Sequence, residues 1–189
     1  AMQPVFPFPH RKDAATEALR TPPHSQEAEQ AVLGGLLLDN ATWDQIADRL
    51  DETDFYRNDH QLIFRAIRRL AEQSKPFDPL TLTEWLDDHH ELEAAGGLAY
   101  IGMLADDTPS AANVRAYADI IRERSIRREL IRTSTEIADM AYDPKGRHSR
   151  ELLDDAEKRV FAIAERGTRT QQGFANIKDL LARTVERID

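Results

Sequence analysis

The sequence predicts an all-α protein in which a compact multi-helix globule is followed by a long protruding helical hairpin and a separate amphipathic linker helix. Apolar residues recur at spacings of three and four along most of the chain, which is the period of amphipathic helices. No segment has the sustained alternation typical of a β-strand. Residues 110–142 contain neither proline nor glycine, and this predicts one long helix.

Composition limits the classes of function. A chain of 189 residues with 41% hydrophobic residues can bury a core, and it has no apolar run of the ~20 residues that a membrane span needs. The start lacks a signal-peptide pattern, so we predict a cytoplasmic protein without membrane contact. The absence of cysteine excludes disulfides, thiolate catalysis and cysteine zinc sites. A net charge of -9 argues against nucleic-acid binding by the whole chain, so any basic patch must be local.

The first folded unit is predicted over residues 24–108. Residues 1–23 hold five of the nine prolines and predict a disordered lead-in. Ser25 is a good N-cap for a helix that ends near Leu38. Two further helices are predicted over residues 42–50 and 58–73. Another is predicted to begin at Thr81, because Thr81 and Glu84 have the spacing of a capping box. A short last helix is predicted through residues 100–104.

Two adjacent glycines, Gly34 and Gly35, lie inside the first helix, where each costs about 1 kcal/mol relative to alanine. Gly35 shares a helical face with small residues, so we predict that a second helix approaches it closely. Gly34 lies to the flank of that face and has no such explanation. The predicted core-packing residues are Gly35, Leu36, Phe64, Ile67 and Tyr100.

The hairpin is predicted over residues 109–166. Early in the long helix, Val114, Ala118 and Ile121 share one face, whereas later apolar residues such as Leu130 lie close to the opposite face. We infer that the first half packs on the globule and that the second half pairs with a return helix over residues 149–166. This pairing covers only part of the apolar surface, which predicts self-association.

Residues 167–173 are polar and bounded by glycines, so they predict a flexible linker. Residues 174–189 then predict an amphipathic linker helix. This helix has no glycine or proline stop signal, so we expect further protein after Asp189.

The sequence contains no motif of a catalytic, cofactor-binding or metal-binding site. Neither G-x-x-x-x-G-K-[ST] nor G-x-G-x-x-G occurs, and the adjacent His89 and His90 lack the helical spacing of paired metal ligands. Five arginines are clustered in the long helix. A solvated face with i,i+4 ion pairs is the favoured interpretation of this cluster, and contact with an acidic partner or a nucleic-acid backbone is the alternative. The cluster consists of Arg122, Arg124, Arg127, Arg128 and Arg132.

Four stretches, taken in order and spacing, resemble the N-terminal region of DnaB-type replicative DNA helicases, from residue 23 to the end of the chain. They are PHSQEAEQAVLGGLLLDN (23–40), DFYRNDHQLIF (54–64), the run of Gly96, Gly97 and Tyr100, and TPSAANVRAYADIIRERSIRREL (108–130). The resemblance implies a helical globule, a hairpin and a linker helix, followed by a RecA-like ATPase motor that this sequence lacks. ATP and Mg²⁺ are accordingly expected only in the motor, and this chain is expected to be no enzyme by itself.

The resemblance also implies a function. Such a domain pairs, forms a trimer of dimers on the hexameric ring that unwinds duplex DNA at the replication fork, and recruits primase. The other implied partners are a helicase loader and single-stranded DNA passing through the full-length ring, and the implied location is the cytoplasm, at the nucleoid.

Residue roles also follow from the resemblance. It implies subunit or primase contacts for Ile137, Leu153 and Phe161, and docking on a neighbouring motor domain for Phe174, Ile177, Leu181 and Val185. A stand-alone helical adaptor or DNA-binding regulator is the alternative function. The acidic chain has no short helix–turn–helix with a basic recognition face, which argues against that alternative.

Overall fold

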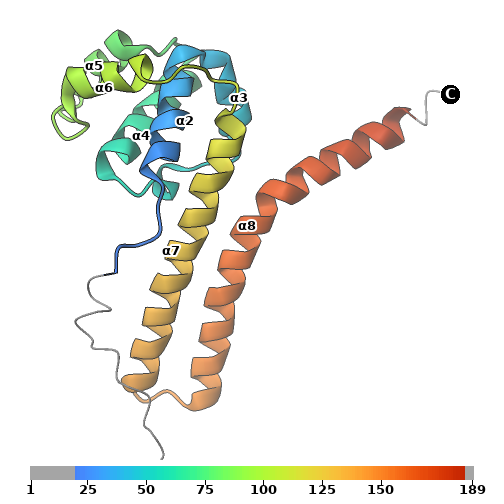
Figure 1. Cartoon of the computed structure of the whole chain (residues 1–189). Coiled ribbons are helices and arrows are strands. Elements are labelled where there is room, and N and C mark those ends of the chain that lie inside the picture. The colour runs from blue at the N-terminus through green and yellow to red at the C-terminus, as the bar shows by residue number, and fades with distance from the viewer. Residues whose placement is uncertain (1–19, 186–189) are drawn as a thin grey trace, which may run out of the picture.

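The computed structural model describes the backbone of residues 20–185, with the side chains of residues 20–167 and Arg183. Within these residues it is helical and has no strand, which confirms the predicted fold class. The helices are α2 (Gln26–Leu38), α3 (Trp43–Ile46), α4 (Asn58–Glu72), α5 (Pro79–Asp88), α6 (Gly97–Asp106), α7 (Val114–Tyr142) and α8 (Ser149–Val185), with 3₁₀ turns η1 (Asn40–Thr42) and η2 (Glu52–Asp54). Figure 1 shows α2 to α6 gathered around one end of α7, with α7 and the first part of α8 side by side beyond them.

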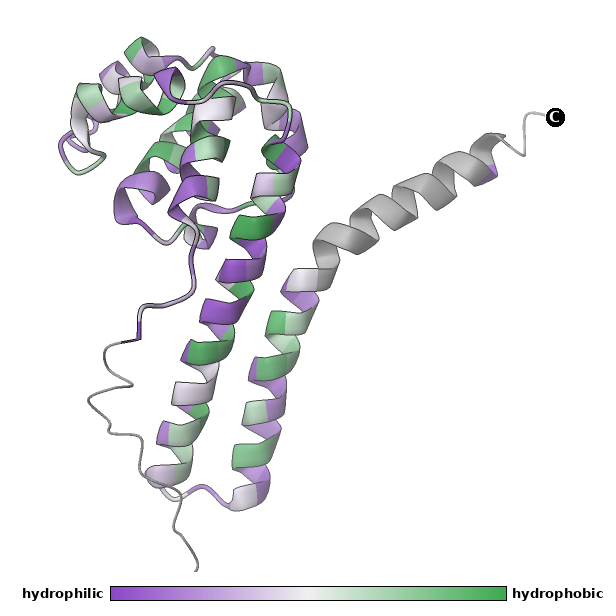
Figure 2. Ribbon diagram, in the orientation of Figure 1, coloured by the Kyte–Doolittle hydropathy of each residue, from purple (hydrophilic) through white to green (hydrophobic). Residues whose placement is uncertain are grey.

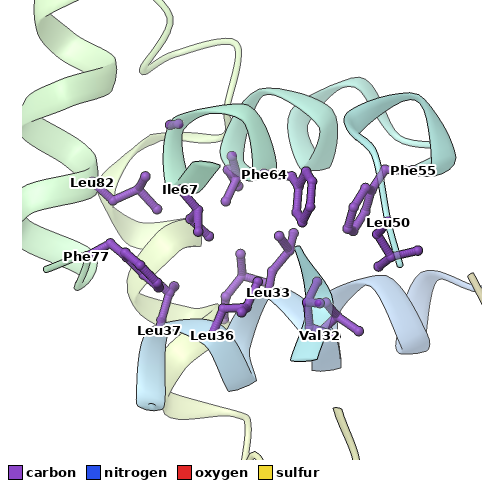
Figure 3. Packing of buried hydrophobic residues seen from close by; sticks show 14 of the residues in the cluster. Val32, Leu33, Leu36, Leu37, Leu50, Phe55, Phe64, Ile67, Phe77 and Leu82 are labelled. Carbon is purple, nitrogen blue, oxygen red and sulfur yellow. The ribbon is translucent and has the colours of Figure 1, made fainter. Parts of the chain in front are cut away.

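Helix α2 is the central packing helix of the globule. Its N-cap is Ser25, as predicted, with the hydroxyl accepting a hydrogen bond from the Ala28 N–H at 3.2 Å. It packs against α4, α6 and α7, so it is buried on several sides. Its apolar side chains meet those of α4 and α5 in one core, where Leu33, Leu36, Phe64 and Ile67 are fully buried (Figure 3).

The close approach on α2 occurs at Gly34, not at Gly35 as predicted. A Cβ atom at Gly34 would lie 1.9 Å from the Thr108 Oγ1 and 2.3 Å from the Leu104 carbonyl oxygen. A Cβ atom at Gly35 would lie 3.6 Å from Ala111 Cα, which is ordinary van der Waals contact. The last turn of α6 and Thr108, two residues after its end, therefore leave no room for a side chain at Gly34.

Two helices begin or extend differently from the prediction. The capping box of α5 pairs Asp78 with Thr81, because Thr81 N–H donates to Asp78 Oδ1 at 2.8 Å and Asp78 N–H donates to Thr81 Oγ1 at 2.9 Å. Pro79 occupies the first helical position, where its missing N–H has no partner to lose. The helix predicted over residues 42–50 is also shorter, since α3 covers only Trp43–Ile46.

Helix α7 has two partners, as predicted. It spans 29 residues, or about 43 Å at 1.5 Å per residue. Near its start, Val114, Ala118 and Ile121 are buried against the globule. Farther along, α7 packs against α8. The side facing α8 holds the buried Thr133, whereas Leu130 is 44% exposed, so the two packed sides of α7 are not opposite one another.

Helix α8 is continuous through residues 167–173, where we predicted a flexible linker. The polar residues between Gly167 and Gly173 are compatible with a helix, and a single glycine lowers helix stability by about 1 kcal/mol without ending the helix. The side chains of Phe174, Ile177, Leu181 and Val185 lie outside the described residues, as do residues 1–19 of the predicted lead-in.

Candidate partner interface: the helical hairpin and its root

The hairpin is held together by a narrow buried seam. Thr133 of α7 and Ile163 of α8 are the buried members, and Ile126 lies against the backbone of Gly167. The seam covers one side of each helix only. Because two paired helices bury little of each other's surface, much of the apolar side-chain surface of the hairpin faces outward.

We define the hairpin face as Leu130 of α7 together with Leu153, Val160 and Phe161 of α8. Their exposed fractions are 44%, 70%, 47% and 62%. Leu153 and Val160 lie seven residues apart, two helical turns, and so share one side of α8. Figure 2 shows hydrophobic bands along both helices of the hairpin, away from the globule. Of the predicted contact residues, Leu153 and Phe161 are exposed and Ile137 is half-buried.

A surface groove of about 410 Å³ adjoins the hairpin face. It is lined by Asp154, Glu157, Lys158 and Phe161, which follow one another at helical spacing on α8. The Phe161 ring is thus an apolar group with charged neighbours. Such an arrangement, an exposed aromatic anchor surrounded by polar groups, is typical of protein–protein contact surfaces.

The tip of the hairpin is fixed by ion pairs. Arg159 donates to Asp155 Oδ1 at 3.0 Å and to Glu136 Oε2 across the hairpin at 2.6 Å. Arg147, in the turn, donates to Asp155 Oδ2 at 3.0 Å. The hydrogen bonds from Arg159 and then Arg147 lower the pKa of Asp155.

The root of the hairpin is organised by one buried carboxylate. Asp54, in η2, is 0% exposed, and its Oδ1 accepts hydrogen bonds from three side chains. These are Arg122 Nη1 at 2.9 Å, Ser125 Oγ at 2.7 Å and Arg166 Nη2 at 3.3 Å. We call these four residues the root cluster. It joins the globule to both helices of the hairpin.

The predicted arginine cluster divides into two groups. Arg122 belongs to the root cluster, and its Nη2 also donates to the Arg166 carbonyl oxygen at 2.7 Å. Arg128 donates to the carbonyl oxygens of Asp54 at 2.6 Å and Pro23 at 2.8 Å, and its guanidinium lies over the Tyr56 ring. Among the described residues, Arg124, Arg127 and Arg132 make no ion pair. The first group supports the fold, whereas the second group makes no ion pair within the described part of the chain.

A second polar network lies inside the globule. His60 is 0% exposed; its Nδ1 lies 2.8 Å from Glu29 Oε1, and its Nε2 lies 2.6 Å from the Tyr100 hydroxyl. Glu29 is 1% exposed and accepts hydrogen bonds from the backbone N–H groups of Tyr56 and Arg57. Burial raises the pKa of Tyr100. The network ties α2, α4 and α6 together around satisfied polar groups.

These two networks were missed in the sequence. Glu29 has the position of an ordinary first-turn acid, and Asp54 lies next to a turn, so burial of either carboxylate has no local signal. Both lie within the stretches that carry the family resemblance, at 23–40 and 54–64, and that was the only available signal.

His89 and His90 have structural positions at the end of α5. The His89 ring stacks on Trp85 with centroids 3.7 Å apart, and its Nδ1 is 2.7 Å from the Trp85 carbonyl oxygen. His90 has a positive φ of 58°, beyond the end of the helix. Over the part of the chain that the structure describes, no group of three or more potential ligands could hold a metal ion. No helix in that part is both long and apolar enough to span a membrane.

These features define a class of protein: an all-helical interaction domain, in which a globule carries a projecting hairpin with an exposed apolar face. The family model described as DnaB-like helicase N terminal domain matches residues 21–123. The chain belongs to this family.

Sequence relatives support this family assignment. The Replicative DNA helicase DnaB of Haemophilus influenzae is 45% identical over 177 residues, which are 94% of this chain and 38% of that protein. The protein of the same name from Geobacillus stearothermophilus is 42% identical over 170 residues, 90% of this chain and 37% of that protein. The chain thus spans less than two fifths of the length of these relatives.

Solved structures with a similar fold support the assignment as well. The N-terminal domain of DnaB helicase from Mycobacterium tuberculosis superposes with a TM-score of 0.72 at 34% identity, covering 75% of this chain and 99% of that one. A DnaB-like replicative helicase, whose structure is described with its interactions with primase, superposes with a TM-score of 0.61 over 74% of this chain and 31% of that one. At 19% identity the second likeness shows the fold alone.

Proposed function

We propose that this domain is the non-catalytic assembly and primase-recruiting domain of a hexameric replicative DNA helicase. The observation that carries the proposal is the hairpin face, a projecting apolar surface in a chain of this family. The described interactions of the DnaB-like helicase with primase support the recruiting role. Membership of the family gives the stand-alone adaptor or regulator no support.

In this proposal the hairpin face pairs copies of the domain into dimers, and three dimers form the collar of the ring. Leu153 and Phe161 contact the second copy or primase, with Ile137 at the edge of the face. Phe174, Ile177, Leu181 and Val185 dock on a neighbouring motor domain, which also holds ATP and Mg²⁺. A helicase loader, single-stranded DNA in the ring and a cytoplasmic location at the nucleoid belong to the same proposal.

Self-association tests the hairpin face directly. We expect sedimentation velocity to show concentration-dependent dimers for the 189-residue chain, and we expect Leu153→Glu to shift it to monomers because the charge would be buried at the contact. Leu80→Glu is the matched control, since Leu80 is 64% exposed on α5 of the globule. A strict monomer at high micromolar concentration, or equal loss of dimers in both variants, would contradict the proposed pairing.

Primase recruitment needs a separate measurement. We expect the chain to bind the C-terminal domain of its cognate primase in a calorimetric titration, and Phe161→Ala to weaken that binding by removing the exposed aromatic anchor. Affinity unchanged in Phe161→Ala would remove Phe161 from the primase contact. Absence of binding by the unaltered chain would sink the recruiting role.

A further inference from the structure

Arginine side chains surround a second cavity, at the root of the hairpin, which the proposed assembly role does not use. The cavity measures about 350 Å³, near the lower end for small-ligand sites. Three elements form it: η2, α7 and α8. Its lining residues are Thr53, Ser125, Arg128, Glu129, Arg132 and Arg166.

The spacing on α7 explains why these side chains converge. Ser125, Arg128, Glu129 and Arg132 stand at i, i+3, i+4 and i+7, so all four project from one face of the helix. The hairpin then brings Arg166 of α8 to the same place. The cavity therefore depends on the pairing of α7 with α8.

The charges in the cavity are unbalanced. Among the described lining residues, three arginines face a single carboxylate, that of Glu129, and this carboxylate is paired with Arg166. Behind the cavity, Asp54 is already shared between Arg122 and Arg166. The formal charge of the lining is thus +2, in a chain whose net charge is -9.

Two of the lining arginines have no carboxylate partner among the described residues. Within the described part of the chain, Arg128 donates to neutral carbonyl oxygens only, and burial lowers its pKa more than the nearby Glu29 and Asp54 raise it. Arg132 makes no hydrogen bond or ion pair with any described residue. Next to the cavity, Arg122 has a buried Nε without a hydrogen-bond partner. An anion in the cavity would relieve this excess of positive charge.

The donors match a phosphate group. Guanidinium groups form paired hydrogen bonds with phosphate oxygens, and these charge-assisted bonds are stronger than neutral ones. The Thr53 hydroxyl accepts from Arg166 Nη2 at 3.0 Å, so its own hydrogen can be donated to a ligand. Ser125 donates to Asp54 and supplies no further hydrogen.

We propose that this cavity binds a small phosphate-bearing anion, of the size of pyrophosphate or the phosphates of a nucleotide, between Arg132, Arg128 and Thr53. The small volume of the cavity favours a small anion over an extended nucleic-acid backbone, which would need a continuous basic groove. A ligand there contacts η2 and α7 next to Arg166 of α8. It therefore stabilises the root of the hairpin in the arrangement described above.

Pyrophosphate is the probe for calorimetry and thermal unfolding of the 189-residue chain. We expect a single site, with Tm rising by about 3–6 °C when pyrophosphate is at ten times its Kd. Arg132→Ala weakens binding by about ten-fold or more, because one charge-assisted contact is lost. Circular dichroism should show an unchanged fold, since Arg132 supports no other described residue.

Arg127→Ala is the matched control. Arg127 is exposed on another face of α7 and makes no ion pair with the described residues. Its loss should therefore change the affinity for pyrophosphate less than two-fold, which corresponds to about 0.4 kcal/mol of binding free energy. Equal weakening in the Arg127 and Arg132 variants would mean non-specific charge attraction and overturn the site. Failure of pyrophosphate to bind the unaltered chain would also overturn the site. Tighter binding of a short single-stranded DNA than of pyrophosphate would replace the proposal with a nucleic-acid surface.

Discussion

Gly34 and Gly35 are neighbours on α2 with different surroundings, and substitution by alanine separates them. We expect Gly34→Ala to lower the free energy of unfolding by about 1–3 kcal/mol, because the new methyl group overlaps Thr108 and the Leu104 carbonyl. Gly35→Ala adds a methyl group at ordinary contact distance and improves helix propensity, so it should be neutral or stabilise by up to about 1 kcal/mol.

Urea unfolding of both variants measures this difference, and each serves as the control for the other. A greater loss of stability in Gly35→Ala than in Gly34→Ala would contradict the packing described here.

At the residue scale, prediction from sequence succeeded where periodicity alone decides burial. Leu36, Phe64 and Ile67 are fully buried, and each lies on the apolar stripe of its helix. It failed for Gly34 because a helical wheel shows which side a residue faces but not which neighbour meets it. Prediction from sequence also could not identify Asp54 or Glu29 as buried. The burial of each carboxylate is compensated by hydrogen-bond partners about 30 to 110 residues away along the chain.

At the scale of elements, the ion pairs of the hairpin tip have a pH dependence with a defined sign. The pKa of Asp155 is lowered in the folded state by Arg159 and Arg147, so its contribution to stability is present above the unfolded pKa, about 3.9, and is lost as pH falls through the folded pKa. We expect Asp155→Asn to lower Tm slightly at neutral pH, and the difference from the unaltered chain to vanish in acid.

Asp154→Asn is the control for this prediction, because Asp154 makes no ion pair with the described residues. Thermal scans across the acidic range would contradict the assignment if both variants behaved alike, or if the effect of Asp155→Asn persisted at the lowest pH.

The elements themselves could be predicted to different degrees. The long helix α7 and its return helix follow from sustained periodicity without proline or glycine. The segment over residues 167–173 was misjudged because its composition suits both a linker and a helix, and the helix continues there from an established preceding turn. The hairpin face could be predicted in part. The wide apolar stripe on the helices of the hairpin indicates more apolar surface than their pairing can cover. Only the packed structure shows that Leu130 lies outside the buried seam between the two helices.

At the scale of the whole molecule, the direction in which the hairpin projects depends on the root cluster. Asp54 is the sole described side-chain acceptor shared by Arg122 of α7 and Arg166 of α8. Removing it leaves the partly buried Arg122 without a described carboxylate partner and Arg166 with Glu129 alone, so we expect Asp54→Ala to lower the free energy of unfolding by about 3–5 kcal/mol. The control, Asp119→Ala, removes an exposed ion pair with Arg49 and should cost about 0–1 kcal/mol.

The loss of stability in Asp54→Ala should also be greater in the hairpin than in the rest of the molecule. With Asp54 absent, the first part of α8 loses its attachment to η2, so amide hydrogen exchange over residues 149–166 should accelerate more than exchange in α5, which packs mainly on α4 and α6. Mass spectrometry of the exchanged chain distinguishes the two cases. Equal acceleration in α5 and α8 would show that Asp54 supports the globule as a whole, and that the hairpin is oriented by the apolar contacts of Val114, Ala118 and Ile121 instead.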